Sequence, residues 1–91
     1  METYLVSFQL NDQSDYDKVA ERLRTYPKWA RVVRSVWFVK SDTKLTDVRE
    51  SVSSILRVNG GGSVFVMNIA DNAWGTYAVE KRVTAWMKEN I

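Results

Sequence analysis

The order of extended and helical segments is the feature that most constrains the fold of this chain. Residues 3–10 (TYLVSFQL) alternate with period two and are rich in β-branched and aromatic side chains, which predicts a strand. Apolar residues then recur at helical spacing as far as Pro27, which predicts a helix ending near residue 25. Ser14, with Asp17 three residues later, is typical of a capping box at the start of this helix.

Predicted strands and helices also alternate in the rest of the chain. Residues 30–41 predict one long strand or a tight pair of strands. A second helix is expected to begin near residues 44–46 and to end at residues 59–62 (NGGG), because glycine and asparagine tolerate the positive φ of a helix stop. Residues 63–71 predict another strand, and helical spacing from Tyr77 onward predicts a final helix.

This order predicts a single α+β domain over residues 1–91. The expected fold is a ferredoxin-like βαββαβ sandwich, with an antiparallel sheet, helices on one face and a C-terminal helix. One face of the sheet would then stay uncovered and present apolar side chains to water. We therefore expect a homodimer formed through the sheet, with Leu5 and Trp37 at the interface.

The composition excludes several classes of site. The 91 residues include no cysteine and no histidine, so disulfides, zinc–thiolate sites and Ser-His or Cys-His nucleophile pairs are ruled out. Catalysis would have to rest on carboxylates, lysine, tyrosine or backbone groups. The N-terminal residues do not resemble a signal peptide and the apolar runs are short, so we expect a cytoplasmic protein without membrane contact.

Cations gather in one part of the chain. Residues 18–40 hold seven lysines and arginines against Glu21 alone, a local charge of +6 in a chain of net charge +2. This pattern predicts a phosphate-binding surface, or alternatively a solvated helix face with lysines at strand edges. The nucleic-acid-binding candidates are Arg31, Arg34 and Lys40. Arg31 and Arg34 should face opposite sides of the sheet unless a bend or bulge intervenes.

Residues 34–40 (RSVWFVK) have a superficial likeness to the sheet signature of the RNA-recognition motif. In that motif two aromatic residues share the exposed face and stack on bases. Here Trp37 and Phe38 are adjacent and must point to opposite faces, and Ser35 stands where the motif has glycine. The pattern therefore argues against that motif.

The tryptophans differ in their expected roles. Trp37 is expected in the core or at the dimer interface rather than as a base-stacking platform. Trp86 lies on an amphipathic helix and is expected in the core. Trp74 lies in a predicted turn and is the one expected to be most exposed.

Taken together, these segments resemble a family of small bacterial and phage proteins described as SinR-family or CRISPR-adaptation-subunit-like. The resemblance implies a ferredoxin-like fold, a homodimer, and a role as either a metal-dependent nuclease or a non-catalytic DNA-binding scaffold. The residues that carry it are Phe8-Gln9-Leu10-Asn11, Trp29, Ser35-Val36-Trp37-Phe38-Val39-Lys40-Ser41-Asp42, Leu45-Thr46 and Trp74-Gly75.

The resemblance also points to where a metal would be held. In the relatives an aspartate ends the first strand, where this chain has Gln9, and a neutral amide balances the charge of Mg²⁺ poorly. Asp12 and Asp42 are the candidate catalytic pair for a Mg²⁺- or Mn²⁺-dependent endonuclease. The alternative is that Asp12 makes a turn and Asp42 caps the second helix.

The leading expectation is therefore a dimeric, non-catalytic module that binds nucleic acid or a protein partner and needs no cofactor. The metal-dependent endonuclease is the alternative function.

Overall fold

Strands and helices follow one another in the predicted order in the computed structural model, which describes residues 1–69, 75 and 78–91. Trp74, and Tyr77 at the expected start of the last helix, lie outside the described residues. The elements are β1 (Glu2–Leu10), α1 (Asp15–Leu23), β2 (Lys28–Val33), β3 (Val36–Ser41), α2 (Leu45–Arg57), β4 (Gly62–Ile69) and α3 (Lys81–Asn90).

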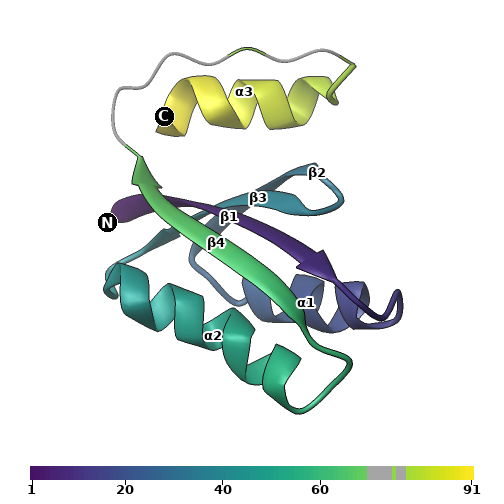
Figure 1. The fold of residues 1–91 in the computed structure, drawn as a ribbon. Helices are drawn as coiled ribbons and strands as arrows, with labels where there is room; N and C mark the ends of the chain where they lie inside the picture. The colour runs from purple at the N-terminus through teal and green to yellow at the C-terminus, as the bar shows by residue number, and fades with distance from the viewer. Residues whose placement is uncertain (70–74, 76–77) are drawn as a thin grey trace.

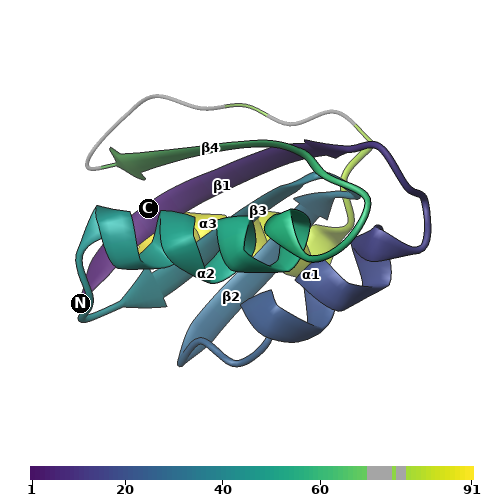
Figure 2. The same ribbon diagram turned by 60° about the horizontal axis from the view of Figure 1, so that its bottom comes forward.

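The four strands form one antiparallel sheet in the order β2-β3-β1-β4, which is consistent with the predicted ferredoxin-like α+β fold. α1 and α2 lie on one face of this sheet, and α3 lies on the other (Figures 1 and 2). The segment from residue 30 to 41 is a tight pair of strands, β2 and β3, rather than one long strand. None of the helices in the described part of the chain is long and apolar enough to cross a membrane.

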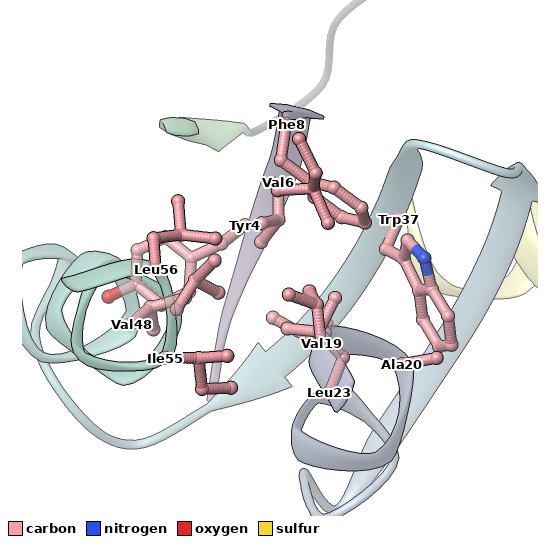
Figure 3. Close-up of a cluster of buried hydrophobic side chains, with 13 residues drawn as sticks. Tyr4, Val6, Phe8, Val19, Ala20, Leu23, Trp37, Val48, Ile55 and Leu56 are labelled. Carbon is pink, nitrogen blue, oxygen red and sulfur yellow. The ribbon is translucent and has the colours of Figure 1, made fainter. Parts of the chain in front are cut away.

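The main core lies between the sheet and the pair α1 and α2. Alternation along β1 turns Tyr4, Val6, Phe8 and Leu10 toward these helices, as the sequence predicts. Trp37 on β3 is the largest of the fully buried side chains and packs beside α1 (Figure 3). Trp37 therefore lies in the core, which was one of its two expected places. Its side chain presents no surface to a second chain.

A second apolar cluster lies between the opposite face of the sheet and α3. Phe38, Ile69 and Met87 are buried there, and Leu5 is half-buried against them. The rings of Phe38 and Trp86 are stacked, with centroids 6.5 Å apart and an interplanar angle of 14°. The face expected to stay open is therefore partly covered by this chain's own last helix, since α3 packs its apolar side on it.

The expected helix caps are replaced by other contacts. Ser14 makes no side-chain cap on α1; its backbone N–H and its hydroxyl instead donate to Oδ1 of Asp12, at 2.9 and 2.8 Å. At α2, Asp47 accepts from the backbone N–H of Lys44 at 3.2 Å. Asp42 does not cap that helix and lies 3.7 Å from the N-terminal ammonium group instead.

A buried carboxylate joins the start of α1 to the connection between α2 and β4. Asp15 is only 1% exposed. Its Oδ2 accepts from the backbone N–H of Gly60 at 2.9 Å, and its Oδ1 accepts from Lys18 Nζ at 3.1 Å. A side chain at position 60 would bring its Cβ to 2.7 Å from Asp12 Cβ, so this close approach requires glycine.

Candidate nucleic-acid interface

Three arginines of the basic segment lie against aromatic rings near α1 and the β2–β3 hairpin. We call these three arginines and the three aromatic residues that they contact the arginine cluster. Its members are Arg24, Arg31 and Arg34 with Tyr16, Trp29 and Trp37.

The β2–β3 hairpin positions Arg31. Trp37 on β3 is the cross-strand partner of Arg31. The guanidinium carbon of Arg31 lies 5.2 Å from the centre of the Trp37 ring. One terminal nitrogen donates to the backbone oxygen of Arg34 at 3.2 Å. These contacts hold the guanidinium on the side of the sheet that faces α1.

Arg34 reaches the same side because the hairpin is irregular. The pairing of β2 with β3 shifts between Arg31 and Val33, which is the kind of bulge that the sequence left open. Arg34 lies in the turn after this shift, and its guanidinium carbon is 4.1 Å from the centre of the Tyr16 ring on α1. Both arginines therefore contact aromatic rings on the α1 side, instead of pointing to opposite faces.

Arg24 completes the cluster from the C-terminal end of α1. Its guanidinium carbon lies 5.7 Å from the ring of Trp37 and 5.8 Å from the ring of Trp29. The two tryptophan rings are themselves 5.4 Å apart and tilted by 45°. All of these arginine–ring distances fall within the cation–π range, so the rings help to fix the guanidinium groups.

The arginines of the cluster are not balanced by acids. Within the described residues, no ion pair involves Arg24, Arg31 or Arg34. Arg24 and Arg34 are exposed to solvent, while Arg31 is half-buried. Three cations on one side of the fold, with no acid of the described residues at ion-pair distance, produce a positive potential that favours binding of an anion such as phosphate.

Two polar atoms inside the cluster also lack a partner. Nε of Arg31 and the ring nitrogen Nε1 of Trp37 are both buried, and neither donates to an acceptor in the described part of the protein. The ring nitrogen of Trp37 lies on the side of the indole away from Val19 (Figure 3). Buried donors of this kind usually have a protein, water or ion partner.

Lys40 lies apart from the arginine cluster. Trp37 and Val39 on β3 face α1 and α2 as part of the main core, so the alternating residues Phe38 and Lys40 face the side covered by α3. Lys40 therefore lies on the opposite face of the sheet from Arg31 and Arg34, and its binding of nucleic acid stays a prediction.

The candidate pair Asp12 and Asp42 is also not brought together. β1 and β3 run antiparallel with Glu2 opposite Ser41, so Asp42 lies near the start of β1 and Asp12 lies beyond its end. The nine residues of β1 span about 30 Å, which is far too long for both carboxylates to bind one ion. No group of three or more His, Cys, Asp or Glu side chains in the described parts of the chain is arranged to hold a metal.

Asp12 forms a local turn with Ser14, which was the expected alternative to a catalytic role. The hydrogen bonds from the backbone and hydroxyl of Ser14 lower the pKa of its carboxyl group below 3.8. Asp12 is exposed, so this effect reflects the local turn and not burial.

Sequence reasoning did not assign four residues of the cluster to a binding site: Arg24, Tyr16, Trp29 and Trp37. Arg24 was part of the basic segment, but its place at the end of α1 beside the hairpin depends on how the helix packs on the sheet. A regular two-residue hairpin would pair Arg31 with Phe38, and the bulge pairs it with Trp37 instead. The bulge has no signature in the sequence, so the contact between Arg31 and Trp37 was not predictable from spacing alone.

Comparison with known proteins does not extend this description. No protein-family model matches the chain, and no curated protein matches its sequence. The predicted resemblance to the CRISPR-adaptation-subunit-like family thus stays a prediction, and the function is argued from the geometry of the cluster.

Proposed function

We propose that this chain is a non-catalytic nucleic-acid-binding module that uses the arginine cluster to contact the phosphate backbone. The observation that carries the proposal is the grouping of Arg24, Arg31 and Arg34 on one side of the fold, each against an aromatic ring and none in an ion pair within the described residues. Guanidinium groups are well suited to phosphate because they are planar, always charged and donate several hydrogen bonds.

The chemistry of the cluster favours binding without sequence preference. Contacts from arginine to phosphate position a nucleic acid but carry no base information. Trp29 is 38% exposed beside Arg24, and an exposed ring next to cations is the usual platform for a base of a single strand. We therefore expect single strands to bind at least as well as duplexes.

The proposal includes a homodimer of the CRISPR-adaptation-subunit-like type, as the resemblance implies. Support comes from β4, an edge strand on which Phe65 and Met67 are 58% and 41% exposed at alternating positions on the same face. Leu5 pairs with Met67 across β1 and β4, so this apolar surface continues the face on which α3 packs. Two copies joined there would place two arginine clusters in one particle.

Light scattering tests the dimer. We expect a mass near twice 10.5 kDa at micromolar concentration, and a smaller mass for Phe65→Lys, because a charge at this position opposes apolar contact. A wild-type monomer at high concentration would contradict the dimer and leave nucleic-acid binding to be judged by itself.

Fluorescence anisotropy with short labelled oligonucleotides tests the binding. Wild-type protein should bind single strands and duplexes at low salt, and the double variant Arg31→Ala/Arg34→Ala should bind at least about tenfold more weakly. Lys40→Ala is the matched control, since it removes a cation from the opposite face of the sheet and should bind like the wild type. The proposal is refuted if wild type does not bind at low salt or if the double variant binds equally well. A protein partner would then be the better hypothesis.

A further inference from the structure

The two unpartnered donors of the arginine cluster carry an inference beyond general backbone binding. Trp37 is fully buried, yet its Nε1–H donates to no acceptor among the described residues. Nε of Arg31, on the neighbouring strand, is also buried and also lacks an acceptor there. Leaving such a group unsatisfied is unfavourable, because the group loses its hydrogen bonds to water and gains none in the protein. Two of them on neighbouring strands indicate a position where an acceptor belongs.

The surroundings decide what kind of acceptor fits. Arg31 and Arg24 both lie over the Trp37 ring, at 5.2 and 5.7 Å, and both are cations. The nearby backbone oxygen of Arg34 already accepts from Arg31. A neutral water could accept from the two donors, but it would leave the positive charge uncompensated. An anion would accept from both donors and also balance the guanidinium groups.

We propose that Arg31 Nε and Trp37 Nε1, together with the guanidinium of Arg24, form a site for one phosphate group that has three free oxygens. Inorganic phosphate and the terminal phosphate of an oligonucleotide share this chemistry. A terminal phosphate carries a charge between about −1.5 and −2 at pH 7 and three strong acceptor oxygens, and inorganic phosphate is also an anion with at least as many oxygens. Arg24 is exposed, so its side chain can move aside to admit the anion and then close over it.

A terminal phosphate fits this position better than an internal phosphodiester does. Trp37 has no exposed surface, so a ligand atom reaches its ring nitrogen only where side chains around it, Arg24 among them, move aside. An internal phosphodiester carries a sugar on each side and only two unesterified oxygens. A terminal phosphate has a sugar on one side only and three oxygens free to accept hydrogen bonds. The oligonucleotide form of this inference rests on the proposed function, whereas the inorganic phosphate form does not.

The ring N–H signal of Trp37 provides a direct test in the intact protein. The chain has four tryptophans, so a ¹H–¹⁵N spectrum shows few indole signals, and assignment identifies the one from Trp37. Titration with inorganic phosphate, at constant ionic strength set by chloride, should move this signal in a saturable way. The signal of Trp86, which stacks on Phe38 on the other face, should stay in place. No movement of the Trp37 signal would show that the position holds water only and would overturn the inference.

Two variants separate the donors from the charge. Arg31→Lys keeps the cation but removes Nε, and we expect it to weaken phosphate binding by about tenfold, as loss of a charge-assisted hydrogen bond does. Arg49→Lys makes the same change at an exposed position of α2 and is the matched control. Trp37→Phe removes the second donor, with Trp86→Phe as its control; circular dichroism verifies that each variant is folded. Unchanged phosphate affinity in Arg31→Lys would also overturn the inference.

Oligonucleotides that differ only at their ends identify the source of the phosphate. A single strand with a terminal phosphate should bind about tenfold more tightly than the same strand with hydroxyl ends, and Arg31→Lys should abolish the difference. If inorganic phosphate moves the Trp37 signal but the ends bind alike, the ligand is the free anion. If oligonucleotides do not bind while phosphate does, the proposed function fails and this site stands. If oligonucleotides bind through the arginines but phosphate has no effect on the Trp37 signal, the phosphate site fails and the proposed function stands.

Discussion

Replacing Asp15 with alanine should destabilise the protein more than replacing any other acid in α1. The carboxylate is buried and accepts from the backbone N–H of Gly60 at 2.9 Å, thereby linking α1 to the connection between α2 and β4. Asp15→Ala would leave that N–H without its acceptor and would remove the contact with Lys18.

The expected loss follows from these two contacts. A hydrogen bond to a charged group contributes roughly 1.5–3 kcal/mol to stability. The Lys18 side chain is half exposed, so its ion pair with Asp15 contributes no more than about 1 kcal/mol. Together they give a loss of roughly 2–4 kcal/mol, which for a domain of this size lowers the melting temperature by at least about 8 °C.

Chemical denaturation followed by circular dichroism measures this loss. Asp17→Ala is the matched control, because Asp17 is an exposed acid in the same first turn and should cost only about 0.3–1 kcal/mol through the helix dipole. Asp15→Asn keeps an acceptor oxygen and should fall between the two. If Asp15→Ala is no less stable than Asp17→Ala, the buried carboxylate does not link the two elements as described.

Gly60→Ala should lower the free energy of unfolding by roughly 1–3 kcal/mol, because the new Cβ would lie 2.7 Å from Asp12 Cβ; a variant as stable as wild type in urea denaturation would contradict this close packing. Burial, aided by nearby carboxylates, raises the pKa of Tyr4 above 10.0, so its contribution to stability is present below pH 10 and is lost as the pH rises through the raised pKa. Tyr4→Phe should therefore flatten the fall in stability above pH 10, and an unchanged alkaline profile would refute this assignment. Wild-type protein should not cleave DNA or RNA with Mg²⁺ or Mn²⁺, because Asp12 and Asp42 lie at opposite ends of β1; cleavage lost in both Asp12→Ala and Asp42→Ala would refute the arrangement.

The fold was predictable because its signals are local and repeated. Period-two alternation identified the buried face of β1, and helical spacing identified α1 and α2 together with the residues they bury. The prediction of the last helix was less accurate: helical spacing was expected from Tyr77 onward, but α3 begins at Lys81. The packing of α3 on the second face was not predicted, since an amphipathic helix has an apolar side whichever surface it covers.

The candidate site was predictable only in part, because it depends on register. Composition identified the basic segment that holds Arg31, Arg34 and Lys40, but it does not show that Lys40 lies on the other face of the sheet. The face to which each side chain points is set by the pairing of β2 with β3 and by the bulge after Arg31. The pairing of Asp12 with Asp42 failed for a similar reason, since both end a strand but the two strands are antiparallel.

The salt dependence of single-strand binding tests the role of the arginine cluster most directly. Each phosphate contact contributes about 0.7 to the slope of log affinity against log salt concentration, so three arginines account for roughly two units of slope per subunit engaged. We predict that Arg24→Ala/Arg31→Ala/Arg34→Ala reduces the slope by about two units for each subunit engaged, while Lys40→Ala leaves it unchanged. A triple variant that keeps the wild-type slope would contradict the claim that these arginines bind the phosphate backbone.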